Sequence, residues 1–309
     1  MKAKTIRHYG GPEVLTLEEV GRPDPGEHEI VIRVRAAGVN PIDWKVREGE
    51  MKESGFHQLP LIPGWDVAGE VDQIGQGVTR FAVGDSVYAL LNLKDNGSYA
   101  EYAITSDACV ALKPETLDFI MAASVPMAAL TAYEALDKMN IQKGDRVLIH
   151  GAAGSVGSFA VQLAYLRGAY VIGVASSGDS AFLSSLGAEE ALAYDSAPFE
   201  HLVENVDAVL DVIGGDILQR SWRVLKPGGV LVSTVEEPQP TQEAQARSNR
   251  SEMILVSPSG TLLTEIARLI DSGQIKVRVS AVMPLNEAEK AQELARSYHH
   301  RGKVVLHVA

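Results

Sequence analysis

The clearest chemical signal in the chain is a set of three glycines, Gly151, Gly154 and Gly157, in the segment HGAAGSVG. They follow an apolar stretch, RVLIH, and precede SVGSFAVQLAYLR, which is typical of a helix. In such a strand–turn–helix, the second glycine lets the backbone approach a pyrophosphate and the third lets the helix pack close to the strand. The amides of Ser155 and Val156 would then face the anion. The pattern predicts a dinucleotide site, with a tight structural turn as the alternative.

The next strand, AYVIGVA, leads into Ser176 and Ser177, where NAD(H) sites commonly carry an acid that binds the ribose hydroxyls. A carboxylate would repel a 2′-phosphate, whereas small hydroxyls can donate hydrogen bonds to it. The missing acid therefore predicts NADP(H) rather than NAD(H). No Lys or Arg lies between Arg167 and Arg220, so the positive charge on the phosphate must come from another loop. Methyl transfer from S-adenosylmethionine uses a similar glycine loop, but the same missing acid disfavours it.

Two kinds of sequence must position these residues. Up to about residue 112, short β-like stretches alternate with Gly, Pro, Asn and Asp, which is typical of a partly open barrel of antiparallel strands. The later part alternates strands with helices, which predicts a parallel sheet covered on both faces. The predicted fold class is therefore α/β, a Rossmann-type doubly wound parallel sheet plus a β-rich, partly open barrel. Residues 236–251 are expected to form a surface loop, and residues 253–257, MILVS, a strand.

Composition limits the partners that this chain can have. It has 309 residues, of which 46% are hydrophobic, and a net charge of −12, which disfavours nucleic acid and an anionic membrane surface. Cys109 is the only cysteine, so neither an internal disulfide nor a multi-thiolate zinc site can form. We expect no targeting or membrane segment and a reducing, cytoplasmic setting.

Several segments together carry a family resemblance: IRVRAAGVNPIDWKVREG, LPLIPGWDVAGEV, PMAALTAYEAL, HGAAGSVG, LKPGGVLVS and RGKVVLHV. Their order and spacing resemble the medium-chain dehydrogenase/reductase superfamily, most closely its quinone oxidoreductase-like, zeta-crystallin-type branch. The resemblance implies a GroES-like catalytic domain over residues 1–122 and 265–309. It also implies a dinucleotide-binding domain over residues 123–264, an active-site cleft where the two meet, and a homodimer that pairs through the strand at 253–257.

The resemblance also bears on zinc. In zinc-dependent relatives a cysteine, a histidine and a second cysteine hold the metal, and the matching positions here are Asn40, Trp65 and Met127. None of these side chains is a thiolate or an imidazole. Alcohol oxidation needs a Lewis acid to stabilise an alkoxide, whereas a quinone or an α,β-unsaturated carbonyl can accept hydride without one. We therefore expect a zinc-free, NADP(H)-dependent reductase of such small molecules.

The expected catalytic residues are Asn40, Lys45 and Asp66. The Asn40 amide could donate to a developing oxyanion, although Asn before Pro is also an ordinary turn residue. Lys45 matches a proton-relay position and could instead be a solvated surface lysine. The resemblance puts Trp65 and Asp66 on a wall of the pocket, with packing and local capping as the alternatives, and Trp44 is expected to line the substrate pocket.

The remaining expectations concern the cofactor. Asp43 either caps the helix after Asn40 or lies near the cofactor ribose, and Thr131 either bonds the nicotinamide or its own helix backbone. The ends of later strands should contact the cofactor through backbone atoms. The expected cofactor-binding residues outside the glycine turn are Asp43, Thr131, Ser176, Ser177, Ile213, Gly214, Ser233, Thr234, Val256, Ser257 and Lys303.

Two further activities stay open at this point. One is reduction of a dedicated biosynthetic enoyl intermediate, which the lack of an evident basic groove for coenzyme A disfavours. The other is a non-catalytic, NADPH-binding or structural role. The acidic balance argues against RNA as the partner in such a role.

Overall fold

The structure is a computed structural model that describes residues 1–55, 57–297 and 301–308. The chain divides into two compact units: unit 1 comprises Met1–Leu130 and Ser257–Ala309, and unit 2 comprises Thr131–Val256. The divisions therefore lie at 130/131 and 256/257, each eight residues from the boundary expected from the sequence. No helix among the described residues has the length and apolar character needed to cross a bilayer.

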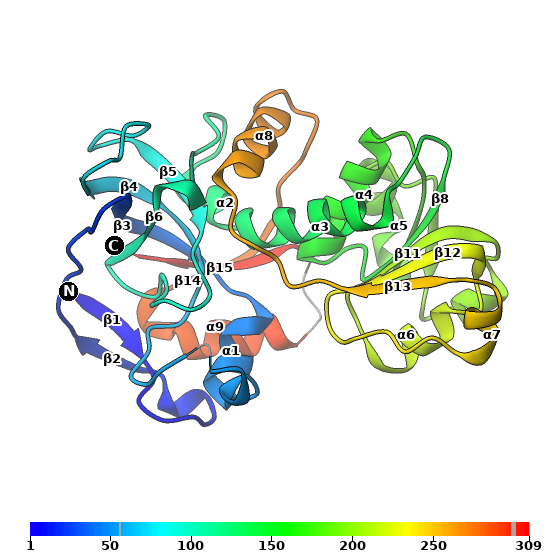
Figure 1. Cartoon of the computed structure of the whole chain (residues 1–309), viewed down its shortest axis with the longest axis horizontal. Coiled ribbons are helices and arrows are strands. Elements are labelled where there is room, and N and C mark those ends of the chain that lie inside the picture. The colour runs from blue at the N-terminus through cyan, green and yellow to red at the C-terminus, as the bar shows by residue number, and fades with distance from the viewer. Residues whose placement is uncertain (56, 298–300, 309) are drawn as a thin grey trace. The chain divides into compact units, whose positions relative to one another are not determined.

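Unit 1 is built on a seven-stranded sheet with the order β14-β15-β3-β4-β5-β7, in which β6 also pairs with β3 (Figure 1). Its pairs are antiparallel except β14 with β15. The last strand lies beside the third because Val305 pairs with Gly38, so the C-terminal segment completes the sheet. Its strands are β3 (Glu29–Gly38), β4 (Asp66–Ile74), β5 (Ser86–Leu90), β6 (Tyr102–Ser106), β7 (Val110–Leu112), β14 (Val279–Pro284) and β15 (Lys303–His307).

A separate antiparallel hairpin and several helices complete unit 1. In α8 the buried residues Leu263, Ile266 and Ile270 recur at helical spacing, and the Ser259 hydroxyl caps the helix by accepting the Leu262 amide at 3.2 Å. The elements are β1 (Lys2–Thr5), β2 (Thr16–Glu19), α1 (Pro41–Glu48), α2 (Phe119–Ala123), α8 (Gly260–Asp271) and α9 (Ala288–Arg296). The helix α3 (Pro126–Met139) begins in unit 1 and ends in unit 2.

Unit 2 is a six-stranded, all-parallel sheet with the order β10-β9-β8-β11-β12-β13. In Figure 1, α4 and α5 lie on one face of this sheet and α6 and α7 on the other. The Rossmann-type doubly wound sheet is thus confirmed. Its elements are β8 (Arg146–His150), α4 (Ser155–Leu166), β9 (Tyr170–Ala175), α5 (Ser180–Ser185), β10 (Glu190–Ala193), β11 (Val206–Asp211), α6 (Gly215–Ser221), β12 (Leu225–Ser233), α7 (Gln242–Ala246) and β13 (Arg250–Met253).

Two local predictions were wrong. The expected surface loop at 236–251 contains α7, which Thr241 caps by accepting the Ala244 amide at 3.1 Å. The strand expected at 253–257 lies earlier, because β13 begins at Arg250 and ends at Met253. This strand lies at the edge of the sheet, where polar residues such as Arg250 and Glu252 are tolerated and hide the strand pattern.

Candidate active site

Asn40 stands at the junction between β3 and α1. It is the N-cap of α1, Pro41 occupies the first helical position, and the backbone N–H of Asn40 donates to Asp43 Oδ2 at 2.8 Å. The chain can turn closely here because Gly38 ends β3 without a side chain. A Cβ at Gly38 would lie 2.5 Å from the Ala123 carbonyl oxygen and 2.8 Å from an Asp66 carboxylate oxygen. The local sequence therefore brings Asn40 against Asp66.

Asp66 joins three segments of unit 1 that are distant in sequence. Its Oδ2 accepts the Asn40 side-chain Nδ2–H at 2.9 Å and lies 2.8 Å from Lys303 Nζ. Its Oδ1 accepts the Met127 backbone N–H at 2.7 Å and so satisfies an amide in the first turn of α3. The Lys303 ammonium also donates to Asn40 Oδ1. Four predicted positions, Asn40, Asp66, Met127 and Lys303, thus meet around one carboxylate.

This ion pair is buried. Asp66 is 0% exposed and Lys303 only 2%, so both charges are desolvated and depend on each other. The Lys303 charge is held inside unit 1 by Asp66 and Asn40. Its contact with a cofactor phosphate stays a prediction.

Asp43 lies beside this ion pair. Burial raises the pKa of the Asp43 carboxyl to about 7, although the Asn40 N–H, the Tyr99 hydroxyl and the Lys303 charge each act to lower it. Tyr99 donates to Asp43 Oδ2 at 2.7 Å, and burial raises the pKa of Tyr99 far above its usual value. Asp43 Oδ1 is buried and has no hydrogen-bond partner among the described residues. The site therefore contains a carboxyl group that is half ionised near neutral pH.

A second set of polar side chains in unit 1 was not predicted from the sequence. Arg47 is 0% exposed and donates to Gln292 at 2.6 Å and to Glu48 at 2.7 Å. Arg296 donates to the same Glu48 oxygen at 2.6 Å. These contacts join α1 to α9. No motif marks them, because arginine and glutamine on amphipathic helices are ordinary surface residues in a sequence.

The two tryptophans expected at the substrate pocket are both buried. Trp44 is 4% exposed and Trp65 is 0% exposed, with the indole N–H of Trp65 donating to the Asp95 carbonyl at 3.2 Å. The His57 ring lies 5.3 Å from the Trp65 ring. Lys45 is half-buried on α1. Their contact with substrate stays a prediction.

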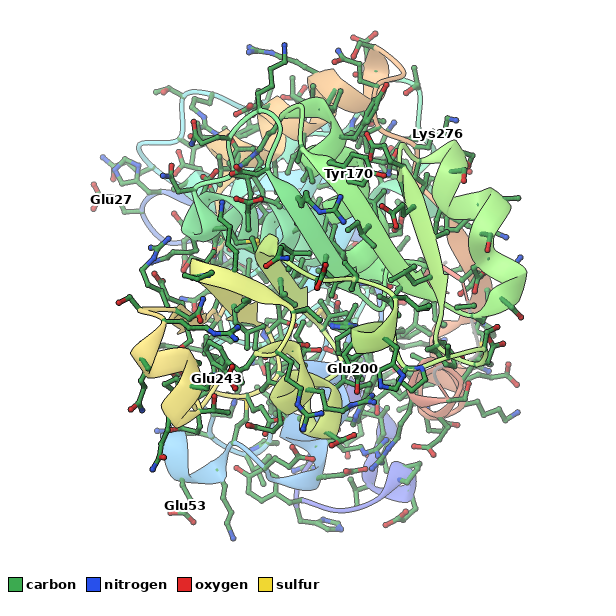
Figure 2. The ribbon with its side chains drawn as sticks, turned by 90° about the vertical axis from the view of Figure 1, so that its right-hand side faces the viewer. Glu27, Glu53, Tyr170, Glu200, Glu243 and Lys276 are labelled. Carbon is green, nitrogen blue, oxygen red and sulfur yellow. The ribbon has the colours of Figure 1, made fainter. Side chains whose placement is uncertain are left out.

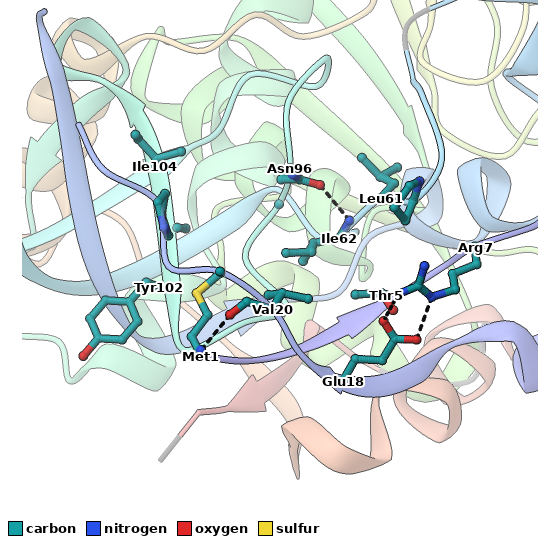
Figure 3. A pocket seen from close by; sticks show the side chains of 15 residues that line it. Met1, Thr5, Arg7, Glu18, Val20, Leu61, Ile62, Asn96, Tyr102 and Ile104 are labelled. Carbon is teal, nitrogen blue, oxygen red and sulfur yellow. Dashed lines mark hydrogen bonds and ion pairs between the residues drawn. The ribbon is translucent and has the colours of Figure 1, made fainter. Parts of the chain in front are cut away.

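A cavity of about 370 Å³ in unit 1 contains none of the predicted residues (Figure 3). Figure 3 shows the Arg7–Glu18 ion pair, at 2.9 Å, and the Met1 ammonium donating to the Val20 carbonyl at 2.8 Å. Among its polar side chains, Arg7 pairs with Glu18, and Asn96 accepts the Ile62 backbone N–H at 2.9 Å. The reactive groups identified above lie outside this cavity, so it is not our candidate site.

The glycine turn of unit 2 has the tight geometry that its sequence predicts. Gly151 has a φ of +64°, and the Gly154 N–H donates to its carbonyl at 2.9 Å. A Cβ at Gly157 would lie 2.2 Å from the Gly151 carbonyl oxygen, so only glycine lets α4 begin this close to the loop. Gly154 is the N-cap of α4, and the first turn of that helix, including Ser155 and Val156, contains no acidic residue. The helix terminus can therefore receive an anion.

Carboxylates near the ends of β9, β10 and β11 accept hydrogen bonds from residues that were predicted to contact the cofactor. The Ser177 amide and hydroxyl both donate to Asp195, and the Ser176 hydroxyl donates to Asp179. Asp211, the last residue of β11, accepts the Ile213 amide at 3.2 Å and the Gly214 amide at 2.8 Å. These amides are turned toward Asp211, so a ligand would meet the side chain or carbonyl groups of that loop.

The other predicted cofactor residues occupy varied surroundings. The Ser233 hydroxyl accepts the Val235 amide at 3.1 Å and is buried, whereas Thr234 is partly exposed. Thr131 is 7% exposed on α3. Val256 is buried and Ser257 exposed, on either side of the division between the units. Their contacts with a cofactor stay predictions.

Comparison with known proteins places this architecture in a family. The alcohol dehydrogenase GroES-like domain matches residues 26–115, and the model described as zinc-binding dehydrogenase matches residues 186–306. The 2-methylene-furan-3-one reductase of Solanum lycopersicum is 36% identical over 99% of this chain and 79% of its own. The chain belongs to the medium-chain dehydrogenase/reductase family. This bears out the family resemblance and the GroES-like assignment.

Further relatives place this medium-chain dehydrogenase/reductase in the quinone oxidoreductase-like branch, and it is an oxidoreductase. The NADPH-dependent alkenal/one oxidoreductase of Arabidopsis thaliana is 34% identical over 99% of this chain and 79% of its own. The solved structure of the quinone oxidoreductase from Coxiella burnetii has a TM-score of 0.90 and 35% identity, and it covers 100% of this chain and 99% of its own.

The zinc named in the matched family model does not fit the residues of this medium-chain dehydrogenase/reductase. The positions that the resemblance aligns with zinc ligands are Asn40, Trp65 and Met127. The Asn40 carboxamide and the Met127 backbone amide both donate to Asp66, and Trp65 is buried. No group of three or more His, Cys, Asp or Glu side chains that could hold a metal lies within residues 1–55, 57–297 and 301–308. The donor set lacks the thiolates and imidazoles of a zinc site.

Proposed function

We propose that this chain is a zinc-independent, NADP(H)-dependent reductase that delivers hydride to a quinone or an α,β-unsaturated carbonyl compound. The observation that carries the proposal is the bonding around Asp66. Two of the three positions that hold zinc in relatives, Asn40 and Met127, are tied to this carboxylate, and the local positive charge is the Lys303 ammonium. The side chains of this cluster include no thiolate or imidazole to hold the Lewis acid that alcohol oxidation requires, so an already electron-poor acceptor suits the site better.

The glycine turn of unit 2 supports a dinucleotide. A cradle in which a Cβ at Gly157 would collide with backbone, followed by a twelve-residue helix without acids in its first turn, fits a pyrophosphate. The amides after Gly154 would hold it. The printed name of the Arabidopsis thaliana relative includes NADPH, which supports the same cofactor here. When bound, NADPH supplies the hydride.

The residues of unit 1 would stabilise the charge that develops on the acceptor. Lys303 and Asp66 hold the Asn40 amide from both ends, since its oxygen accepts from the ammonium and its nitrogen donates to the carboxylate. A carboxamide nitrogen has two hydrogens, and Asp66 takes one. We assign the other to the oxygen of the developing enolate or quinolate. An amide fixed in this way needs little reorganisation as charge develops.

Lys45 remains our candidate for the proton donor. It is half-buried on α1, five residues after the Asn40 N-cap and on the same short helix as Asp43. A K45M variant that keeps full turnover would remove Lys45 from this role.

A substrate panel tests the proposal. Consumption of NADPH is measured with a 1,4-quinone and a short 2-alkenal, and NADP⁺ reduction with a primary alcohol. We expect turnover with the first two, none with the alcohol, and no loss of rate after dialysis against a chelator. Stoichiometric bound zinc by elemental analysis, or chelator-sensitive alcohol oxidation, would overturn it. Tight NADPH binding without turnover of any acceptor would favour the non-catalytic role.

We also propose that the chain forms homodimers through the β13 edge of unit 2. This strand pairs with β12 on one side only, and Met253 at its end is 43% exposed. Light scattering after size exclusion should give twice the mass of one chain. A Met253→Lys variant should give a lower mass, because a charged side chain at a strand edge opposes pairing with a second copy.

A further inference from the structure

Two neighbouring strands of unit 2 bring together residues that lie far apart in sequence. β9 and β10 run parallel, with Val174 beside Leu192 and Ala175 beside Ala193. Tyr170, which Figure 2 labels, lies at the opposite end of β9. It ties the same two strands by donating to Glu190 at 2.8 Å. At the carboxyl ends the chain continues into Ser177 after β9 and Asp195 after β10. In a dinucleotide-binding sheet, this edge is where the adenosine ribose is recognised.

Asp195 occupies the donors of Ser177. The Ser177 backbone N–H lies 3.1 Å from Asp195 Oδ1 and 3.3 Å from Oδ2, and the Ser177 hydroxyl lies 2.9 Å from Oδ2. The hydroxyl of Ser176 is likewise taken, since it donates to Asp179 Oδ2. Both hydroxyls that the sequence offers to a 2′-phosphate therefore already donate to carboxylates.

No Lys or Arg close in sequence compensates the negative charge of Asp179 and Asp195. The Ser177 hydroxyl and then its amide lower the pKa of the Asp195 carboxyl, so it is ionised at neutral pH. The segment from Arg167 to Arg220 contains no other Lys or Arg. Both of these arginines are paired, Arg167 with Asp137 at 2.7 Å and Arg220 with Glu200 at 3.1 Å. An added phosphate would meet negative charge and occupied donors.

We propose that Asp195 determines how this enzyme discriminates between NADPH and NADH, and that it weakens the preference for NADPH enough for both to be used. It does so in two ways: it holds the donors of Ser177, and it places a negative charge beside the 2′ position of the ribose. Asp195 follows β10, the third strand of unit 2. The acid of NAD(H) sites usually follows the second strand of such a sheet, which here is β9. This inference rests on the proposed function, because it concerns the same cofactor.

Calorimetric binding of NADP⁺ and NAD⁺ tests the inference without depending on turnover. For the parent chain we expect Kd values within about tenfold of each other. In D195N the carboxylate charge is gone and Ser177 can turn to the phosphate, so the Kd for NADP⁺ should fall about 5- to 20-fold. The Kd for NAD⁺ should stay within about twofold. The Kd for adenosine 2′,5′-bisphosphate should change in the same way as the Kd for NADP⁺, since this compound carries the 2′-phosphate without the nicotinamide.

Two further variants make the result specific. E204Q removes one negative charge at an exposed residue that precedes β11, at the amino ends of the strands, and should leave both Kd values unchanged. Adding S177A to D195N should cancel most of the gain for NADP⁺, because the freed hydroxyl is lost.

The possible failures are distinguishable. If the parent chain binds neither dinucleotide, the proposed function is refuted and the inference with it. If both bind but D195N leaves the ratio of the two Kd values unchanged, only the inference is refuted. A parent preference for NADP⁺ of more than about a hundredfold would refute it as well. Circular dichroism of each variant shows whether an altered Kd reflects lost folding.

Discussion

Replacing Lys303 with Met should destabilise unit 1 more than an ordinary surface substitution. The change removes the ammonium and keeps a side chain of similar length. It leaves Asp66 at 0% exposure with two donors, the Asn40 amide at 2.9 Å and the Met127 backbone N–H at 2.7 Å. The carboxylate would then carry an uncompensated buried charge.

Removing one partner of a buried ion pair costs about 3–5 kcal/mol, because the other charge stays buried without compensation. Because Asp66 keeps two hydrogen bonds, we expect K303M to fall near the lower end, about 3 kcal/mol. The double variant D66N/K303M has no buried charge at this position. It should therefore recover at least half of that loss. Since D66N alone leaves the Lys303 ammonium unpaired and should also destabilise, the three variants together should give a coupling energy above about 1.5 kcal/mol in magnitude.

Urea unfolding at neutral pH measures these values. The tryptophans of unit 1 are Trp44 and Trp65, and the third tryptophan of the chain is Trp222 in unit 2. A W222F background carried by all variants makes fluorescence report on unit 1 alone, which avoids mixing two unfolding transitions. A cost below about 1 kcal/mol for K303M, or additive effects of the two substitutions, would refute the view that Asp66 and Lys303 stabilise each other.

Three further predictions concern the same two units. Because the pKa of Asp43 is raised from 3.8 to about 7, the folded state binds more protons than the unfolded state between these values, so the free energy of unfolding should fall as pH rises through this window. D43N should flatten that slope, which is at most about 1.4 kcal/mol per pH unit, and an unchanged slope in urea titrations would contradict the assignment. G157A should abolish dinucleotide binding in calorimetry and lower Tm, since its Cβ would lie 2.2 Å from a backbone oxygen, whereas G21A has nothing within 4 Å and should change neither. N40A should lower kcat at least tenfold with little change in the KM for NADPH, and a change confined to KM would argue against a role for Asn40 in stabilising charge on the acceptor.

Much of the fold could be predicted because its elements have strong local patterns. The apolar strands of unit 2, such as Arg146–His150 and Tyr170–Ala175, are separated by helices, and the order of these elements indicates a parallel sheet. Edge elements were harder to predict. β13 at Arg250–Met253 has a polar sequence because it packs on one side only, and the short helix Gln242–Ala246 lies in a run rich in Pro and Gln.

The cluster around Asp66 consists of residues that the sequence analysis singled out, but their arrangement could not be predicted from the sequence. Asn40 and Lys303 are 263 positions apart, and they meet because β15 pairs with β3 through Val305 and Gly38. Periodicity gives the strands but not this pairing. Similarly, Asp195 becomes a partner of Ser177 only through the parallel register of β9 and β10. The absence of an acid at Ser176 and Ser177, directly after β9, was visible in the sequence, whereas the contact of Ser177 with Asp195 after β10 was not.

In the zinc-independent function that we propose, Asp66 takes the place of a metal as the structural link of the cluster. A metal held by positions 40, 65 and 127 would join the start of α1, the start of β4 and the start of α3. Here Asp66 itself stands at the start of β4 and bonds Asn40 before α1, Met127 in α3 and Lys303 in β15. Both partners of this ion pair are buried, so removing either one leaves the other without its compensating charge. If Asn40 has the catalytic role that we propose, the carboxylate that orients it also holds three segments of unit 1 together, so substitutions at Asp66 should affect stability and turnover together.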